Sequence, residues 1–376
     1  MTYSLRNSAW YHVLLLVFSI YLFLLSISLM GSSFKSLGRG FAENLISTTN
    51  HPLTGFFIGL VVTSVVQSSS CTTSIIVSLV ACQSLTIQNA IPLVFGANIG
   101  TSVTNVIVSL GHASRRNEFE KAFTGAIVHD IFNLLSVAVL FPVELYTRII
   151  EHIALSLTDT FAGIGGFEYV SPINLVIDPI KHPLSAALNQ LPHGVVVSVI
   201  VSFALLFYSL KNITSLTRSI LSKKMEKIVD KYLFKTPLTS FLSGILLTSI
   251  VQSSSITTSI VVPLIAAGIL SVEVVFPYVI GANIGTTVTA LMASAATVSS
   301  STGTIYFGGV TIAICHLVFN IFGGLIWYPL RIVPISLSKK LSHIVTQKGR
   351  YAVAYILCFF YLVPLLIIYL TGGRIW

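Results

Sequence analysis

Two short polar motifs occur twice in this chain, and their residue types could bind ions. Gln-Ser-Ser-Ser stands at 67–70 and again at 252–255, and Gly-Ala-Asn-Ile-Gly-Thr stands at 96–101 and again at 281–286. The copies of each motif are 185 residues apart. Hydroxyl and amide groups can donate to an oxyanion or offer neutral oxygens to Na⁺. The doubled pattern predicts one binding site assembled from two halves of the chain.

The motifs belong to longer segments that share a common sequence. Residues 54–105 and 239–290 agree at 28 of 52 positions, far more than two unrelated apolar segments would share. This is the sign of an internal duplication. The positions that agree best are polar residues within apolar segments, which favours a functional over a packing interpretation. The alternative is that serine and threonine in membrane helices often only hydrogen-bond to neighbouring helices.

Composition places the chain in a membrane. It has 376 residues, of which 54% are hydrophobic and 9% charged, against about 25% charged in soluble proteins. We therefore predict an all-α polytopic membrane protein. The net charge of +9 comes from basic residues in short stretches between apolar runs, a pattern typical of membrane-flanking charge rather than of nucleic-acid binding. The four cysteines show no CxxC spacing.

The apolar runs predict the spanning helices, of which the first is expected to be retained rather than cleaved as a signal peptide. Uninterrupted runs stand at about 9–30, 119–145, 193–211, 305–330 and 350–371. Two more segments, 86–110 and 272–297, are long enough to span but carry glycine, asparagine and threonine midway. We interpret both as helices broken near the membrane centre.

Each Gln-Ser-Ser-Ser motif joins two apolar arms that are too short to span. The arms have about 12–16 residues and reach roughly 18–24 Å, whereas the hydrocarbon core is about 30 Å thick. Re-entrant hairpins over about 52–82 and 237–270 are therefore expected, each with its polar tip near the midplane.

Charge then predicts the topology. With the N-terminus in the cytoplasm, seven spans and two hairpins place 16 of the 21 Lys and Arg residues inside, as the positive-inside rule requires. The hairpins then enter from opposite sides, which makes the two repeats inverted. The predicted divisions are repeat 1 at 1–145, an external connection at 146–192, repeat 2 at 193–330, and a cytoplasmic loop with a C-terminal spanning helix at 331–376.

Two connecting segments have their own expectations. The connection at 146–192 holds several glycines and prolines, which predict little regular structure. A polar segment follows the apolar run at 193–211 and ends at residue 235, before the second predicted hairpin. This lead-in has lysines among apolar residues, which indicates an amphipathic helix on the inner membrane surface.

Asp130 is the only acidic residue well inside a predicted span. A carboxylate at that depth is typical of a cation or proton site, but a structural hydrogen bond to His129 or to a helix end would also explain it. The stretch from His129 to Asn133 partly repeats from His316 to Asn320. We interpret the two histidines as core hydrogen-bonding residues and the two asparagines as packing residues.

Three sets of residues resemble the type II sodium/phosphate cotransporter family. They are the paired QSSS motifs, GANIGTSVTN at 96–105 with GANIGTTVTA at 281–290, and AIVHDIFNLLSVAVLFPVE at 126–144. The resemblance implies secondary active import of inorganic phosphate, driven by sodium that enters with it. It also implies that the two QSSS regions form the core of the phosphate and sodium sites. Animal members have longer tails and an external loop with a disulfide and glycans, so we expect a bacterial member in the inner (plasma) membrane.

Coupling to sodium also has a physical basis. Phosphate is an anion, and neither motif region contains a Lys or Arg to neutralise it. Helix N-termini, hydroxyl donors and co-bound sodium must therefore supply the compensation. No other metal and no cofactor is expected. The expected phosphate ligands are Gln67, Ser68, Ser69, Ser70, Asn98, Gln252, Ser253, Ser254, Ser255 and Asn283. The expected sodium ligands are Gln67, Ser68, Thr72, Thr73, Asn98, Thr101, Asp130, Gln252, Ser253, Thr257, Thr258, Asn283 and Thr286, although the four threonines at 72, 73, 257 and 258 could equally be packing residues.

Several alternatives stay open at this point. The chain could carry another oxyanion such as sulfate, or be driven by protons through Asp130. A passive channel conflicts with polar tips that block a straight pore, and a serine hydrolase conflicts with the duplication and with the lack of GxSxG, so no enzymatic activity is expected. The expected partners are inorganic phosphate, sodium and membrane lipids, with a homodimer of separately functional protomers left open and no nucleic acid.

Overall fold

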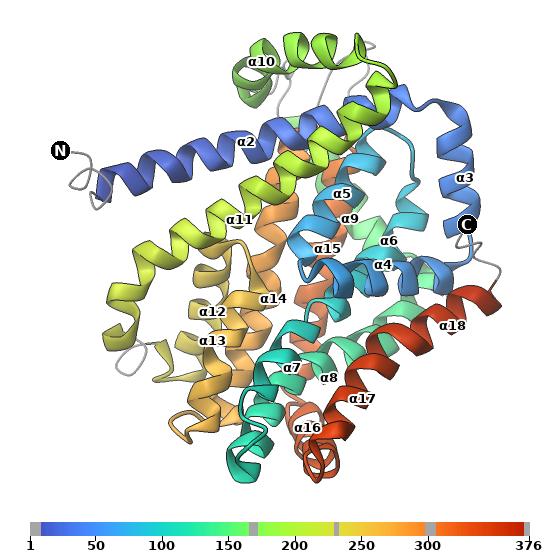
Figure 1. Ribbon diagram of the computed structural model, residues 1–376. Helices are drawn as coiled ribbons and strands as arrows, with labels where there is room; N and C mark the ends of the chain where they lie inside the picture. Colours follow the sequence, from blue (N-terminus) through green and yellow to red (C-terminus); the bar gives the residue numbers. More distant parts are fainter. Residues whose placement is uncertain (1–8, 165–171, 229–232, 298–305, 372–376) are drawn as a thin grey trace.

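The computed structural model describes residues 9–164, 172–228, 233–297 and 306–371, and every regular element in these ranges is helical (Figure 1). In chain order the helices are α2 (Ala9–Ser36), α3 (Arg39–Thr49), α4 (Pro52–Val66), α5 (Ser69–Ala81), α6 (Ile87–Gly100), α7 (Val103–Leu110), α8 (Arg116–Thr147), α9 (Ile149–Ile164), α10 (Pro172–Asn189), α11 (Gly194–Ile228), α12 (Pro237–Val251), α13 (Ser254–Ala266), α14 (Val272–Ala295), α15 (Gly308–Trp327), α16 (Ile332–Val345), α17 (Gly349–Leu357), a π-helical turn (Cys358–Leu362) and α18 (Val363–Leu370).

Seven helical stretches in the described residues are long and apolar enough to cross a membrane. They are Tyr11–Ser36, Ile87–Leu110, Arg116–Thr147, Gly194–Leu216, Val272–Ala295, Gly308–Trp327 and Gly349–Leu370. These are the seven segments that the sequence predicts, so the chain is an all-α multi-pass membrane protein.

The two predicted hairpins are pairs of short helices. The pair α4 and α5 has 15 and 13 residues, and the pair α12 and α13 has the same two lengths. At 1.5 Å per residue, each arm is about 20–23 Å long, less than a bilayer core of about 30 Å. A bend of 101° separates α3 from α4. Each predicted hairpin is therefore a pair of short helices, while its re-entrant path and the entry of the two pairs from opposite sides stay predictions.

The predicted break in the second repeat is wrong, because α14 runs without interruption through the Gly-Ala-Asn-Ile-Gly-Thr motif. In the first repeat only Thr101 and Ser102 separate α6 from α7, and both have right-handed helical dihedrals. The glycines serve close packing instead. A Cβ atom on Gly96 would overlap a backbone oxygen of α4, and one on Gly281 would overlap a backbone oxygen of α12. Small residues four apart let helix backbones approach in this way.

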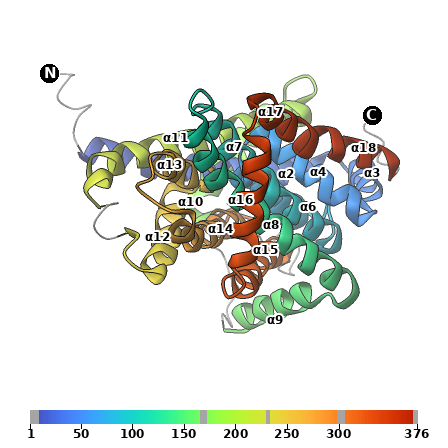
Figure 2. The ribbon, with the colours of Figure 1, turned by 90° about the horizontal axis from the view of Figure 1, so that it is seen from below.

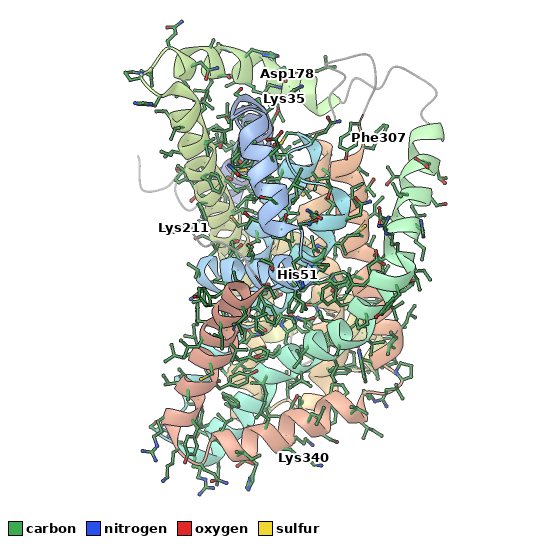
Figure 3. All side chains as sticks on the ribbon, turned by 90° about the vertical axis from the view of Figure 1, so that its right-hand side faces the viewer. Lys35, His51, Asp178, Lys211, Phe307 and Lys340 are labelled. Carbon is green, nitrogen blue, oxygen red and sulfur yellow. The ribbon has the colours of Figure 1, made fainter. Side chains whose placement is uncertain are left out.

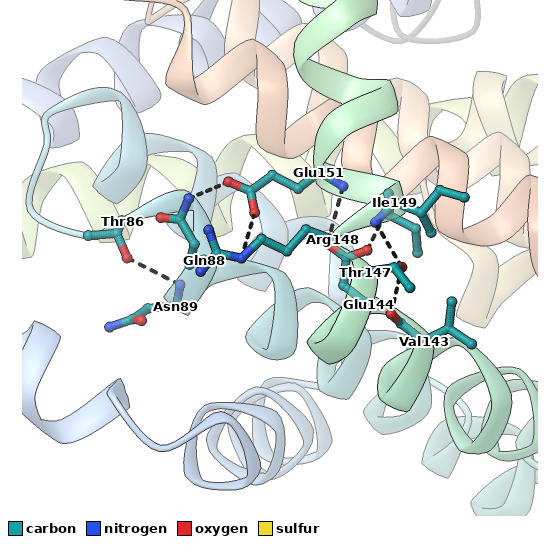
Figure 4. A network of polar contacts seen from close by, with 10 residues as sticks. Thr86, Gln88, Asn89, Val143, Glu144, Thr147, Arg148, Ile149 and Glu151 are labelled. Carbon is teal, nitrogen blue, oxygen red and sulfur yellow. Dashed lines mark hydrogen bonds and ion pairs between the residues drawn. The ribbon is translucent and has the colours of Figure 1, made fainter.

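The prediction of an irregular connection at 146–192 is also wrong, because most of it forms α9 and α10. Ile150 and Ala154 are fully buried, and α9 packs against α15 at the edge of the molecule (Figure 2). The Glu144 carboxylate accepts from the backbone N–H groups of Ile150 (2.7 Å) and Glu151 (3.1 Å) at the start of α9 (Figure 4). Burial and this cap outweigh the helix-breaking residues nearby.

The ends of the molecule carry the flanking residues. Figure 3 shows Lys35, Asp178 and Phe307 toward one end and Lys340 toward the opposite end, whereas Lys211, which the predicted topology places on the side of Lys340, lies about midway. The predicted cytoplasmic loop after residue 330 contains α16, whose Ser342 hydroxyl donates to the Glu120 carbonyl of α8 (2.7 Å). That packing makes it helical rather than a loop. The direction of each end relative to the cytoplasm stays a prediction.

The amphipathic lead-in is a continuation of the spanning helix before it. The helix α11 extends as far as Ile228, while α2 lies alongside it (Figure 1). The lysines that suggested a surface helix, such as Lys223 and Lys231, have side chains outside the described residues. The amphipathic interpretation therefore stays a prediction.

Candidate functional site

The two Gln-Ser-Ser-Ser tips have the same backbone conformation. Gln67 and Gln252 are left-handed, with φ of 55° and 57°, and Ser68 and Ser253 are extended, with φ of −149° and −150°. A left-handed residue other than glycine costs about 1–2 kcal/mol. Both repeats keep this costly turn, and such strain concentrates at functional sites.

The first serine of each motif caps the helix that follows. The Ser68 hydroxyl accepts from the backbone N–H of Cys71 (3.2 Å), and the Ser253 hydroxyl accepts from the backbone N–H of Ile256 (3.4 Å). These bonds satisfy one N–H group at the start of each helix. The N–H groups of the first two residues of α5 and α13 stay without an intrahelical partner and point toward the tips.

The third serine of each motif bonds to the other repeat. The Ser70 hydroxyl donates to the Gln252 carbonyl oxygen (2.7 Å), and the Ser255 hydroxyl donates to the Thr101 carbonyl oxygen (3.4 Å). Ser70 also lies 3.4 Å from the Thr289 hydroxyl. The two hairpin tips, whose motifs are 185 residues apart in sequence, are therefore in direct contact.

The second serine of each motif has no such partner. Ser69 and Ser254 are each 3% exposed as whole residues, and neither hydroxyl forms a hydrogen bond with any residue that the structure describes. Each is the first residue of its helix, beside unpaired N–H groups and the positive end of the helix dipole. This combination of free hydroxyls and free N–H groups is suited to an anion.

The two glutamines differ although their backbones match. Gln67 is exposed, whereas Gln252 is 6% exposed. The Gln252 amide nitrogen lies 2.8 Å from the Met292 sulfur, and its amide oxygen has no partner among the described residues. The site is thus closed around the second tip and more open at the first.

The motif asparagines form two matching clusters with the other repeat. The Asn98 amide oxygen lies 2.9 Å from His316 Nε2, and its nitrogen donates to Asn320 (3.3 Å). The matching Asn283 oxygen lies 2.6 Å from His129 Nε2, and its nitrogen donates to Asn133 (2.6 Å). We refer to these groups as the asparagine–histidine clusters; they comprise Asn98, His316 and Asn320, and Asn283, His129 and Asn133.

The clusters correct part of the sequence interpretation. His129 and His316 are core hydrogen-bonding residues, as predicted, but Asn133 and Asn320 bond to the motif asparagines rather than only packing. The Asn133 amide nitrogen also donates to the Asn98 carbonyl (3.0 Å), which links the two clusters. A signal for them was present in sequence, because each histidine precedes its asparagine by four residues and so lies on the same helix face.

The threonines predicted as sodium ligands mostly bond to their own helices. The hydroxyls of Thr72 and Thr73 donate to carbonyls one turn earlier (3.2 and 2.8 Å), as do those of Thr101 (3.0 Å) and Thr286 (2.9 Å). A hydroxyl that donates in this way keeps lone pairs that could face a cation. These hydrogen bonds are therefore compatible with both interpretations of the threonines, packing and sodium binding.

The matching threonines of the second hairpin also contact other elements. Thr257 bonds to the Thr248 hydroxyl (2.7 Å) across the hairpin, and Thr258 exchanges hydrogen bonds with the Asn105 side chain of α7. Asn105 was not among the predicted site residues. Its amide links the second hairpin to α7 of the first repeat.

Asp130 is fully buried on α8. Its Oδ2 accepts from the Tyr355 hydroxyl (3.0 Å), and its Oδ1 has no hydrogen-bond partner among the described residues. The nearby Ser102 hydroxyl donates to the Ile99 carbonyl instead (2.6 Å). The carboxylate bonds to neither His129 nor a helix end, so one buried oxygen is left for a cation or a proton.

Comparison with known proteins identifies the family. The Na⁺/Pi-cotransporter family model matches residues 22–166 and 205–326. The chain belongs to the Na⁺/Pi-cotransporter family. It is 32% identical to sodium-dependent phosphate transport protein 2B of Homo sapiens over 96% of this chain, 32% identical to protein 2A of Ovis aries over 92%, and 34% identical to protein 2B of Mus musculus over 94%. No solved structure matches the chain.

The family match covers the whole candidate site. Both hairpins, both asparagine–histidine clusters and Asp130 lie inside the matched residues, whereas α10 lies in the unmatched interval. The chain spans 63–66% of the length of these relatives.

Proposed function

We propose that this chain is a sodium-coupled symporter that imports inorganic phosphate. The observation that carries the proposal concerns two buried residues, Ser69 and Ser254, at the starts of α5 and α13, whose hydroxyls have no hydrogen-bond partner among the described residues. Two helix N-termini and two hydroxyls at tips in mutual contact form a concentrated set of donors for a phosphate oxyanion. The relatives named as sodium-dependent phosphate transport proteins support this choice of anion and cation.

We assign different roles to the residues of the two tips. Ser69 and Ser254 bind phosphate directly, together with the N–H groups beside them and the Gln67 and Gln252 amides. Ser68 and Ser253 cap the helices, and Ser70 and Ser255 join the repeats. Asn98 and Asn283, whose amides are held by the asparagine–histidine clusters, position the helices that carry the motifs.

Sodium supplies the positive charge that the site lacks. Residues 52–110 and 237–297 contain no Lys or Arg, so a bound phosphate needs co-bound cations. The proposed sodium ligands are the neutral oxygens around the tips, which include those of Thr72, Thr73, Thr101, Thr257, Thr258 and Thr286, together with Asp130. Among the described residues no group of three His, Cys, Asp or Glu side chains forms a metal cluster, and sodium does not require one.

Transport proceeds by alternating access. Na⁺ binds first and orders the tips, and phosphate then binds between them. The repeats next exchange which side is open, which requires the cross-repeat bonds of Ser70 and Ser255 to break and re-form. The exposed Gln67 and buried Gln252 fit a state that is open at the first hairpin. The N-terminus lies in the cytoplasm, and the protein resides in the plasma membrane as a monomer or a dimer of separately functional protomers.

Uptake into vesicles tests the function. Purified protein in proteoliposomes should accumulate radiolabelled phosphate above its equilibrium level when an inward sodium gradient is imposed, because the two fluxes are coupled. Unlabelled arsenate should compete, and unlabelled sulfate should not. Equal uptake with choline in place of sodium would contradict the coupling, and equal competition by sulfate would contradict the substrate.

The free oxygen of Asp130 favours a second candidate, coupling to protons. We expect Asp130→Asn to lower the apparent sodium affinity of phosphate uptake at least about tenfold, since a change of 1.4 kcal/mol in cation binding has that effect. Tyr355→Phe is the matched control, because it removes the hydrogen bond to Oδ2 but keeps the negative charge. An Asp130→Asn protein with normal sodium dependence that no longer responds to a pH gradient would instead identify a proton site.

A further inference from the structure

An apolar groove of about 360 Å³ lies on the surface between α12, α14 and α15. Its lining is aliphatic and aromatic, and Tyr328 contributes its only polar side-chain atom. Leu238 and Leu325 on its rim are 65% and 66% exposed. The helices α14 and α15 are proposed spans, and α12 is an arm of the second hairpin. The groove therefore faces the hydrocarbon region rather than water.

The helix contacts show which lining residues share an end of the groove. Gly324 of α15 lies against Ile280, and Gly281 of α14 lies against Phe241 of α12. Gly285 lies against Thr248, so α12 runs parallel to α14, and Gly309 lies against Thr297, so α15 runs antiparallel to α14. Pro237, one turn before Phe241, and Tyr328, one turn after Gly324, therefore lie at the same end. The opposite end is formed by Ile284 and Ile321 and is entirely apolar.

Two cationic side chains flank the Tyr328 end. Lys235 stands two residues before Pro237, and the Arg331 guanidinium carbon lies 5.3 Å from the centroid of the Tyr328 ring. Both side chains are exposed, and neither forms an ion pair with an acidic residue that the structure describes. Lys339, by contrast, is paired with Glu273 (2.6 Å).

We propose that this groove binds one acyl chain of an anionic phospholipid, with the lipid phosphate on Arg331 and Lys235. The occupant follows from the pairing of an apolar trough with two unpaired cations at one end, which matches a chain ending in a negative headgroup. The ring of Tyr328 lies where the hydrocarbon meets the headgroups, a position that tyrosine favours in membrane proteins. The site is separate from the hairpin tips, so it does not depend on the proposed transport function.

The test compares two lipids in the same vesicles. The protein is reconstituted in phosphatidylcholine vesicles containing a trace of acyl-chain spin-labelled phosphatidylglycerol or spin-labelled phosphatidylcholine, and the immobilised fraction is measured by electron paramagnetic resonance. Wild-type protein should immobilise phosphatidylglycerol preferentially. K235Q/R331Q should lower the relative affinity for phosphatidylglycerol about tenfold or more, since each cation near the membrane surface contributes to anionic lipid binding.

Matched controls separate the groove from general surface charge. K340Q/K348Q removes two other exposed cations from the same side of the protein and should keep the preference for phosphatidylglycerol. Leu325→Trp, which fills the groove, should reduce the immobilised fraction of both lipids, while Leu337→Trp on exposed α16 surface should not. An equal loss of preference in the two charge variants, or an unchanged immobilised fraction in Leu325→Trp, would overturn the proposal.

Discussion

Replacing Ser69 or Ser254 with alanine is expected to weaken apparent phosphate affinity about ten- to hundredfold in each case. A hydrogen bond to a charged group contributes about 1.5–3 kcal/mol, and each 1.4 kcal/mol is tenfold in affinity. Because neither hydroxyl bonds to another described residue, its removal leaves no protein group unsatisfied, and the effect falls on the ligand. The measurement is the phosphate dependence of sodium-driven uptake, with equilibrium binding of labelled phosphate as a second readout.

Ser74→Ala is the matched control for this pair. Ser74 is fully buried on α5, and its hydroxyl donates to the Ser70 carbonyl one turn earlier (2.7 Å). Ser74→Ala removes the same chemical group, a serine hydroxyl, from the same helix, and it should alter phosphate affinity less than threefold. If Ser69→Ala and Ser254→Ala behaved like Ser74→Ala, both hydroxyls would be excluded from the site.

A methyl group at Gly281 is expected to be among the most damaging small substitutions in the chain. The added Cβ would overlap the Phe241 carbonyl oxygen, and backbone cannot rotate aside as a side chain can. Overpacking costs typically 1–3 kcal/mol and more where nothing relaxes, so we expect Gly281→Ala to lose about 3 kcal/mol or more of folding free energy. The measurement is the thermal unfolding temperature in detergent, detected by size-exclusion chromatography of heated samples.

Gly40→Ala provides the comparison for Gly281→Ala. Gly40 also lies in a helix, but a Cβ atom there would have no neighbour within 4 Å. Alanine is favoured over glycine in a helix by about 1 kcal/mol, so Gly40→Ala should unfold at or above the wild-type temperature. Equal unfolding temperatures for the two variants would show that the crossing of α12 and α14 tolerates a wider separation.

The spans and the pairs of short helices were predictable because they depend on run length. A segment of 20 or more apolar residues can cross the membrane, and an arm of 13–15 residues with a polar end cannot. The irregular connection was mispredicted because glycine and proline report local propensity, whereas α9 is stabilised by burial of Ile150 and by the Glu144 cap. The break in α14 was mispredicted because glycine permits both unwinding and close helix packing, and only the neighbouring backbone decides between them.

The sequence predicts the motifs as a candidate site, but it does not predict which hydrogen bonds each motif residue forms. Three consecutive serines are chemically identical in sequence. At a helix start, however, successive side chains point about 100° apart around the axis. The first caps the helix, the second has no hydrogen-bond partner among the described residues, and the third bonds to the other repeat. The asparagine–histidine clusters were not predicted because their hydrogen bonds join residues more than 150 positions apart in sequence.

The large sequence separation within the asparagine–histidine clusters has a consequence for biosynthesis. The amide of Asn98 finds its partners on α15, 218 and 222 residues later in the chain. During synthesis, α6 must therefore enter the bilayer with a polar side chain whose permanent partners have not yet been translated, an exposure that hydrocarbon penalises. These hydrogen bonds of Asn98 can form only after α15 has been synthesised and inserted. A chain that ends before residue 316 would lack both of these partners, even though its earlier spanning helices would be complete.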